Sequence, residues 1–237
     1  LNNNIGGIMK KVGFIGSFDK INLIIYLAKL FTLNDRKVLI VDATILQKAK
    51  YIVPAISPTV SYITDFEGID VAVGFRNMTE IKQYLAGNNE AELGYDYILF
   101  DIDAAEALEN FEIQTMDKNY FVTSFSTFDI RRGLDAISNI REPIKLTKVL
   151  FSKEILNSED EYLGYLSLGY KVIWDEYKIY FPLEQGDQTA IMENERVSKI
   201  KFGNLSAQYR ESLMFMAEEL LENVSANHIR KIIKNIE

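Results

Sequence analysis

The sequence is poor in the residues on which much cofactor and nucleophile chemistry depends. It has no cysteine and a single histidine, His228, among 237 residues. The lack of cysteine excludes disulfides and cysteine-ligated zinc, and it suits a reducing compartment such as the cytoplasm. One histidine excludes histidine-based metal sites and effectively removes Ser-His and Cys-His catalysis.

Long apolar runs and excess positive charge are also missing. No apolar stretch reaches the roughly 18 residues that a membrane-spanning helix needs. The net charge of −8 gives an acidic surface that repels phosphate backbones, so general nucleic-acid binding is not expected. Residues 1–8 lack the basic start and apolar centre of a signal peptide, and we interpret them as a disordered leader or expression remnant. We expect one domain over residues 9–224, followed by a C-terminal amphipathic helix over residues 225–237.

Short apolar segments alternate with longer helical ones along the chain. The segments that we expect to be strands are apolar along their length, as strands covered on both faces are. This pattern predicts an α/β fold with a doubly wound, mostly parallel sheet and helices on both faces. Strands are expected at 12–15, 37–42, 60–63, 69–73, 95–101, 120–123, 148–151 and 179–182, and helices at 21–33, 79–85, 129–140, 158–169 and 206–224.

Residues 10–22 have the layout of a phosphate-binding loop, a strand that runs into a glycine, a lysine and a helix. In the pattern G-x-x-x-x-G-K-[ST] the lysine lies six residues after the first glycine. Here Lys20 follows Gly16 by only four, Asp19 takes the second-glycine position, and Ile21 replaces the hydroxyl that would hold Mg²⁺. The loop either binds an anion at the helix N-terminus or is a plain turn with Asp19 as a cap and Lys20 in solvent. The candidate ligand-binding residues are Gly16, Ser17, Phe18, Asp19, Lys20 and Ile21.

Two acids end apolar strands, which is where ligands bind in a doubly wound sheet. Asp42 closes the run 38–42, and Asp101 closes the run 97–101. An unpaired carboxylate after a buried strand is costly, so each acid needs a partner. A Mg²⁺ ion, a water that orients a nucleophile or a capped helix N-terminus would each supply one.

The order of these segments resembles the MinD/ParA family of P-loop ATPases, which carry a deviant Walker A motif. The resemblance covers nearly all of the chain from Met9 to about residue 224 and implies a P-loop NTPase-like three-layer fold with ATP or ADP and Mg²⁺ as ligands. It implies catalytic roles for Asp42, which would help to activate the attacking water, and for Asp101, which would act on the metal ion through water. It places Ser152 where the family has an adenine-reading asparagine and Pro182 beside the base.

The departures from the family pattern bear on activity. The short loop lacks the family's signature lysine, Ile21 cannot coordinate Mg²⁺, and the asparagine is replaced by Ser152. Phosphoryl transfer relies on positioning and electrostatic stabilisation, and the loss of one such donor costs about 10²–10³ in rate. We therefore expect a degenerate member, akin to pilus-localising proteins of the CpaE/TadZ type, that acts as a positioning or scaffold module with weak or no turnover.

Two alternatives remain open from the residues. One is an active, dimerising Mg-ATPase that works with Lys20, Asp42 and Asp101. The other is a scaffold whose loop binds no nucleotide, or only a sulfate-sized anion. In either case the resemblance implies a cytoplasmic homodimer with a protein partner from a positioning, pilus, secretion or partition system.

The C-terminal segment 225–237 and an aromatic stretch raise further questions of partners. Isoleucines recur at helical spacing in 225–237, opposite basic residues, so this helix is a candidate for peripheral contact with an anionic inner-membrane surface. Docking on its own domain or on a second subunit is the alternative that the short length favours. The aromatic residues of 162–180 are flanked by acids, which favours core or protein-interface roles over base stacking.

Overall fold

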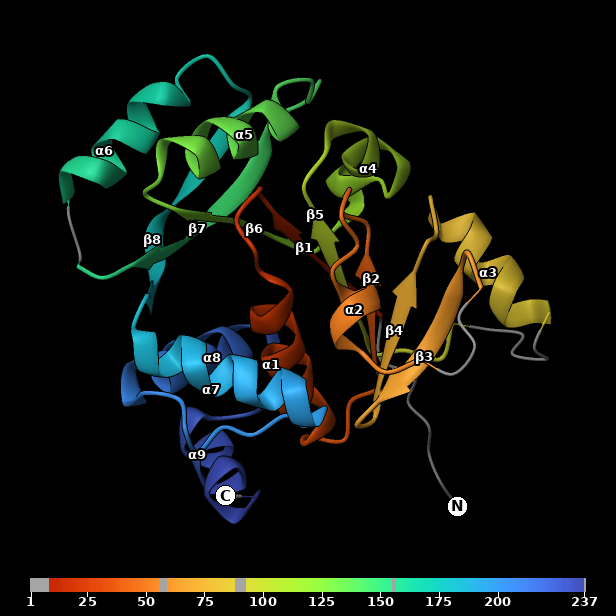
Figure 1. Cartoon of the computed structure of the whole chain (residues 1–237). Helices are drawn as coiled ribbons and strands as arrows, with labels where there is room; N and C mark the ends of the chain where they lie inside the picture. The colour runs from red at the N-terminus through yellow and green to blue at the C-terminus, as the bar shows by residue number, and fades with distance from the viewer. Residues whose placement is uncertain (1–8, 56–58, 88–92, 155–156, 237) are drawn as a thin grey trace.

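The computed structural model of the chain describes residues 9–55, 59–87, 93–154 and 157–236. They form an eight-stranded sheet with helices on both faces (Figure 1). The strands are β1 (Lys10–Ile15), β2 (Val38–Asp42), β3 (Tyr62–Phe66), β4 (Ile69–Val73), β5 (Tyr97–Ile102), β6 (Lys118–Ser124), β7 (Ile144–Ser152) and β8 (Val172–Pro182). The helices are α1 (Ile21–Thr32), α2 (Ala49–Ile52), α3 (Met78–Gly87), α4 (Ala105–Asn110), the 3-10 turn η1 (Ile113–Thr115), α5 (Thr127–Ile137), α6 (Asn157–Leu166), α7 (Gln185–Val197), α8 (Ala207–Leu220) and α9 (Ala226–Ile236).

The strand order is β3-β4-β2-β5-β1-β6-β7-β8, and every neighbouring pair is parallel except β3 with β4. This confirms the predicted doubly wound, mostly parallel sheet. The carboxyl ends of β2, β5 and β1 lie next to one another at its centre. Three segments that are far apart in sequence therefore meet at one edge of the sheet.

Two apolar cores explain why the strands are uniformly apolar. Successive side chains of a strand point to opposite faces. In β5, Leu99 enters the core beneath α1, α7, α8 and α9, whereas Ile98 and Phe100 enter the core beneath α3, α4, α5 and α6. Because both faces are covered by helices, each position of a central strand must be apolar.

The edge strand β3 and its neighbour β4 form a hairpin rather than separate elements. β3 and β4 pair antiparallel, and the two residues between them, Glu67 and Gly68, have φ of 55° and 84°. Two successive positive φ values are typical of the type I′ hairpin turn. The strand expected at 60–63 therefore lies at Tyr62–Phe66, and the glycine supplies the turn.

The opposite edge strand is longer than the sequence suggests. β8 runs over Val172–Pro182, whereas we expected a strand only at 179–182. Asp175 interrupts the apolar pattern, but it forms ion pairs with Lys118 (3.1 Å) and Lys145 (2.8 Å). These lysines make the acid tolerable within a strand. Trp174 packs edge-on against Phe121 at 5.6 Å, which confirms a core role for part of the aromatic stretch.

The C-terminal helices pack on the first core. Ser206 caps α8 by accepting a hydrogen bond from the Tyr209 N–H at 3.1 Å, as its place in the sequence indicates. Ile229 and Ile233 of α9 are buried, and Arg230 pairs with Glu211 of α8 at 2.6 Å. The apolar face of α9 is thus docked on its own chain, and a membrane contact would require both isoleucines to leave it. None of the helices in the described ranges is both long and apolar enough to cross a bilayer.

Candidate functional site

The loop at residues 16–20 connects β1 to α1 at the carboxyl edge of the sheet. Gly16 has a φ of 140°, and a Cβ placed on it would lie 2.1 Å from the carbonyl oxygen of Val122 in β6. The glycine is therefore required by the close approach of the neighbouring strand, whatever the loop binds.

Gly16→Ala is expected to destabilise the chain by about 2–4 kcal/mol, because it adds backbone strain to a clash with backbone atoms. Urea unfolding followed by circular dichroism measures the loss. Gly164→Ala in α6 is the matched control, since nothing lies within 4 Å of the added Cβ. Equal, small effects in both variants would contradict the close approach at Gly16.

Lys20 is folded back into the protein. Its side chain is 2% exposed, its Nζ donates to the carbonyl oxygen of Gly16 at 2.7 Å, and it forms an ion pair with Asp101 Oδ1 at 2.7 Å. The alternative that placed Lys20 in solvent is wrong. The positive charge of Lys20 is therefore paired with Asp101 and buried at the carboxyl edge of the sheet.

Asp101 depends on this lysine. Its side chain is 4% exposed, and Oδ1 accepts no hydrogen bond of good geometry although it touches the ammonium. Burial raises the pKa of Asp101 to about 7, the nearby Asp42 also raises it, and Lys20 lowers it. An acid held this way is costly in its charged form, and Lys20 is the group that compensates it.

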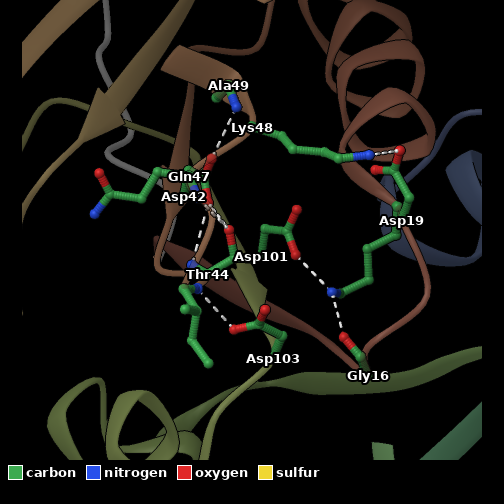
Figure 2. Close-up of polar contacts among 11 residues, drawn as sticks. Gly16, Asp19, Asp42, Thr44, Gln47, Lys48, Ala49, Asp101 and Asp103 are labelled. Atoms are coloured by element: carbon green, nitrogen blue, oxygen red, sulfur yellow. Dashed lines mark hydrogen bonds and ion pairs between the residues drawn. The ribbon is translucent and has the colours of Figure 1, made fainter. Parts of the chain in front are cut away.

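Asp42 organises the segment that follows β2 (Figure 2). One carboxylate oxygen accepts hydrogen bonds from the Thr44 hydroxyl at 2.6 Å and the Thr44 N–H at 3.1 Å. The other accepts from the N–H of Ala49, the first residue of α2, at 2.9 Å. Burial raises the pKa of Asp42, while these donors lower it. Of the three roles that the sequence allowed, this geometry matches the capped helix start.

The remaining polar groups of the edge pair with one another. Asp19 forms an ion pair with Lys48 at 2.5 Å, with both side chains about half exposed, and Asp103 accepts from the N–H of Ile45 at 2.9 Å (Figure 2). Asp19 does not cap α1, which starts without a side-chain cap, so that part of the sequence interpretation is wrong. Sequence reasoning did not single out Thr44, Lys48 or Asp103. Asp42 carried a signal for its contact with Thr44, because an aspartate side chain commonly accepts a hydrogen bond from the backbone N–H two residues further on.

Two other side chains of the candidate loop contact β7 and α5. The ring of Phe18 lies 4.7 Å from that of Phe151, and Ile21 is 1% exposed. The Ser17 hydroxyl donates to the carbonyl oxygen of Asp129 at 3.0 Å. Ser17 and Phe18 stay partly exposed while they make these contacts.

The two residues matched to base recognition are neighbours. Ser152 and Pro182 stand side by side in the register of β7 and β8, so the structure brings them together as the resemblance implies. The Ser152 hydroxyl, however, donates to the carbonyl oxygen of Glu154, and the Glu154 N–H donates back to it at 3.2 Å. Both of these hydrogen bonds hold the Ser152 hydroxyl in a local turn.

These residues do not fit a magnesium triphosphate as they are arranged. Ile21 offers no hydroxyl to a metal ion, and the only lysine of the loop is held by Asp101. Among the described residues, no group of three or more histidines or acids is placed to hold a metal ion.

Comparisons with known proteins address the fold. No protein-family model matches the sequence, and no curated protein matches it significantly. A ParA family ATPase from Chlorobium tepidum has a similar structure, with a TM-score of 0.57 and 15% identity, covering 90% of this chain and 99% of the other. An ATP complex of a McdA variant from Cyanothece (TM-score 0.56, 13% identity) covers 93% of this chain and 100% of the other.

The MinC:MinD cell division protein complex of Aquifex aeolicus is also similar, with a TM-score of 0.55 and 15% identity, covering 91% of this chain and 99% of the other. Identities this low establish the architecture and leave the activity open. The chain therefore has the P-loop NTPase-like fold of the ParA and MinD ATPases.

Proposed function

We propose that this chain is a ParA/MinD-fold protein with little or no nucleotide hydrolysis, which acts as a positioning or scaffold module. The observation that carries the proposal is the buried ion pair between Lys20 and Asp101. A phosphate-binding lysine must point its ammonium at the phosphates. Here that ammonium lies inside the protein against a carboxylate.

The energetics of this pair support weak nucleotide binding. Releasing Lys20 toward a phosphate would leave the carboxylate of Asp101 buried and unpaired. With a pKa of about 7, this acid then stays charged or takes up a proton at a cost of about 1.4 kcal/mol at pH 8 and about 2.7 kcal/mol at pH 9. Because 1.4 kcal/mol is a tenfold change in affinity, this cost weakens binding by about 10–10²-fold. The other cation nearby, Lys48, is already paired with Asp19.

Exposed apolar side chains support a protein-binding role for the same edge. Ile45 and Leu46, in the segment that follows β2, are 63% and 69% exposed, and Tyr51 of α2 is 78% exposed. Apolar side chains gathered on the surface often mark an interface. We propose that a protein partner docks over this segment. The MinD of Aquifex aeolicus, whose fold this chain shares, has a structure in complex with a protein partner, MinC.

The proposal is tested by adding millimolar Mg-ATP to the wild-type protein. A site with a dissociation constant of about 10 μM would gain about 2.7 kcal/mol at a hundredfold excess. That gain would raise Tm by roughly 5–10 °C. We expect a shift within error of zero and no phosphate release above that of buffer.

Molar mass by light scattering gives a second readout. A nucleotide-driven dimer would change its mass on addition of Mg-ATP, whereas we expect the same mass with and without it. Phosphate release by the wild-type protein that disappears in Asp42→Asn would contradict the proposal and favour an active ATPase. Asp135→Asn, an exposed acid on α5, is the matched control for that loss.

A further inference from the structure

A cavity of about 580 Å³ lies between α4, η1 and the end of α5. These helices cover the face of the sheet that α1 does not (Figure 1). The volume is within the usual range of small-molecule sites, about 300–1,000 Å³. The described residues that line the cavity include neither the loop 16–21 nor Asp42, Asp101, Ser152 or Pro182. The cavity is thus separate from the loop and its two acids.

The floor of the cavity is apolar and buried. Leu108 of α4, Ile113 of η1 and Ala136 of α5 line it, and they are 2%, 4% and 2% exposed. Ala105, the first residue of α4, also lines it, so both helices contribute an alanine. Short side chains at these positions leave a hollow that larger ones would fill. An apolar molecule can therefore remove its surface from water here.

Two acids line the cavity from the α4 side. Glu109 lies in the last turn of α4, and Glu112 is the left-handed residue, with a φ of 53°, that turns the chain into η1. Both residues are exposed, and neither carboxylate has a hydrogen bond or an ion pair with any residue that the structure describes. Apolar walls of low dielectric focus the field of such charges, so the α4 side attracts a cation.

The α5 side of the cavity has no such excess of negative charge. Arg141 and Glu142, which follow α5, both line the cavity and carry opposite charges. Lys171 adds a positive charge beside them, since its Nζ donates a hydrogen bond to the carbonyl oxygen of Arg141. The two cations repel a positively charged ligand group from this side. They thereby direct that group toward Glu109 and Glu112.

We propose that this cavity binds a small organic cation that has an apolar body and one ammonium group. The apolar body lies on Leu108, Ile113 and Ala136, and the ammonium lies at Glu109 and Glu112. A neutral molecule of the same shape gains only the burial of its apolar surface, whereas an anion is repelled by two unpaired carboxylates. The site therefore discriminates between ligands by their charge.

Dansylcadaverine, a naphthalene with a primary ammonium on an aliphatic chain, is the probe for this site. N-Pentyl dansylamide has a similar ring and chain without the ammonium. The fluorescence of both rises when the ring leaves water, and we expect a saturable rise as wild-type protein is added. The cation should bind about 3–10-fold more tightly at low ionic strength, the value of one or two exposed ion pairs. Added salt should narrow this difference.

Filling the cavity is expected to remove binding of both probes. Ala105→Leu should weaken it by at least about tenfold, the value of roughly two buried methylene groups. Ala207→Leu is the matched control, because Ala207 is the exposed first residue of α8 and lies outside this lining. It should leave the affinity for both probes unchanged. Circular dichroism establishes that both variants are folded.

Removing one charge is expected to affect only the cationic probe. Glu109→Gln should weaken binding of dansylcadaverine about 2–5-fold and leave that of N-pentyl dansylamide unchanged. Glu106→Gln, an exposed acid on the same helix but outside the lining, is the matched control and should change neither affinity.

Four results would overturn the inference. They are the lack of saturable dansylcadaverine binding, full binding of both probes by folded Ala105→Leu, equal affinity for the two probes at low ionic strength, and an effect of Glu109→Gln no larger than that of Glu106→Gln. The proposed function is tested with Mg-ATP and phosphate release, so its failure is distinguishable from each of these.

Discussion

Replacing Lys20 with methionine is expected to destabilise the fold by about 2–3 kcal/mol near pH 9, because at two pH units above a pKa of about 7 the unpaired Asp101 must either stay charged or take up a proton at this cost. The residue left behind is Asp101, whose side chain is 4% exposed. Urea unfolding followed by circular dichroism measures the loss. A lysine that waits in solvent for a phosphate would lose far less.

The loss should shrink as the pH falls. Burial raises the pKa of Asp101 from 3.8 to about 7. Between these two values the folded chain holds a proton that the unfolded chain has released. The stability that this proton contributes is fully present below about pH 4 and is lost as the pH rises through 7. Without Lys20, which lowers the pKa of Asp101, the acid protonates more readily, so near pH 5 the variant can neutralise it.

Two further variants identify the cause. Lys20→Met combined with Asp101→Leu should recover most of the loss, because buried ion pairs can often be replaced by apolar pairs of similar volume. Lys48→Met removes the partner of Asp19 from a half-exposed pair and should cost only about 0–1 kcal/mol. A loss below about 1 kcal/mol for Lys20→Met near pH 9 would contradict a structural role for this lysine.

Restoring the loop is expected to increase the affinity for Mg-ATP at least about a hundredfold, equivalent to about 2.7 kcal/mol. The change replaces residues 17–21 with Lys-Gly-Gly-Val-Gly-Lys-Thr, which lengthens the loop by two residues and completes the phosphate-loop pattern. The longer loop brings more N–H groups to the phosphates, and the threonine supplies the hydroxyl for Mg²⁺.

Equilibrium dialysis with labelled ATP measures the gain in affinity. A loop of the same length that ends in Gly-Ala-Ala in place of Gly-Lys-Thr is the control, since it lacks the charge and the hydroxyl. A folded, restored chain that gains no affinity would show that the loop is not what limits nucleotide binding.

Much of the sheet was predictable because burial on both faces leaves a plain signal. The runs 38–41 and 97–100 are hydrophobic throughout, each is followed by an aspartate, and both are central parallel strands. β8 was mostly missed, because Asp175 and Glu176 interrupt its pattern and the lysines that compensate Asp175 lie on other strands. α7 was missed as well, since it buries only Asp187, Ala190 and Asn194 and has little apolar periodicity.

The site was predictable in its location and less so in its contacts. Asp42 and Asp101 were expected near the loop, because parallel strands end at one edge, and they are neighbours in the register. The partner of Lys20 could not be predicted. The same glycine and lysine serve a loop that wraps around a phosphate and one that folds back. Which of these two conformations the loop adopts depends on how deeply the Lys20 side chain is buried. That depth follows from the short loop and the apolar start of α1.

Calorimetric titration of Mg-ATP into the wild-type protein tests the central claim most directly. We predict no saturable heat at millimolar nucleotide, because the ammonium of Lys20 is held by Asp101. Saturable heat at about one nucleotide per chain, abolished in the folded variant that carries both Lys20→Met and Asp101→Leu, would contradict it.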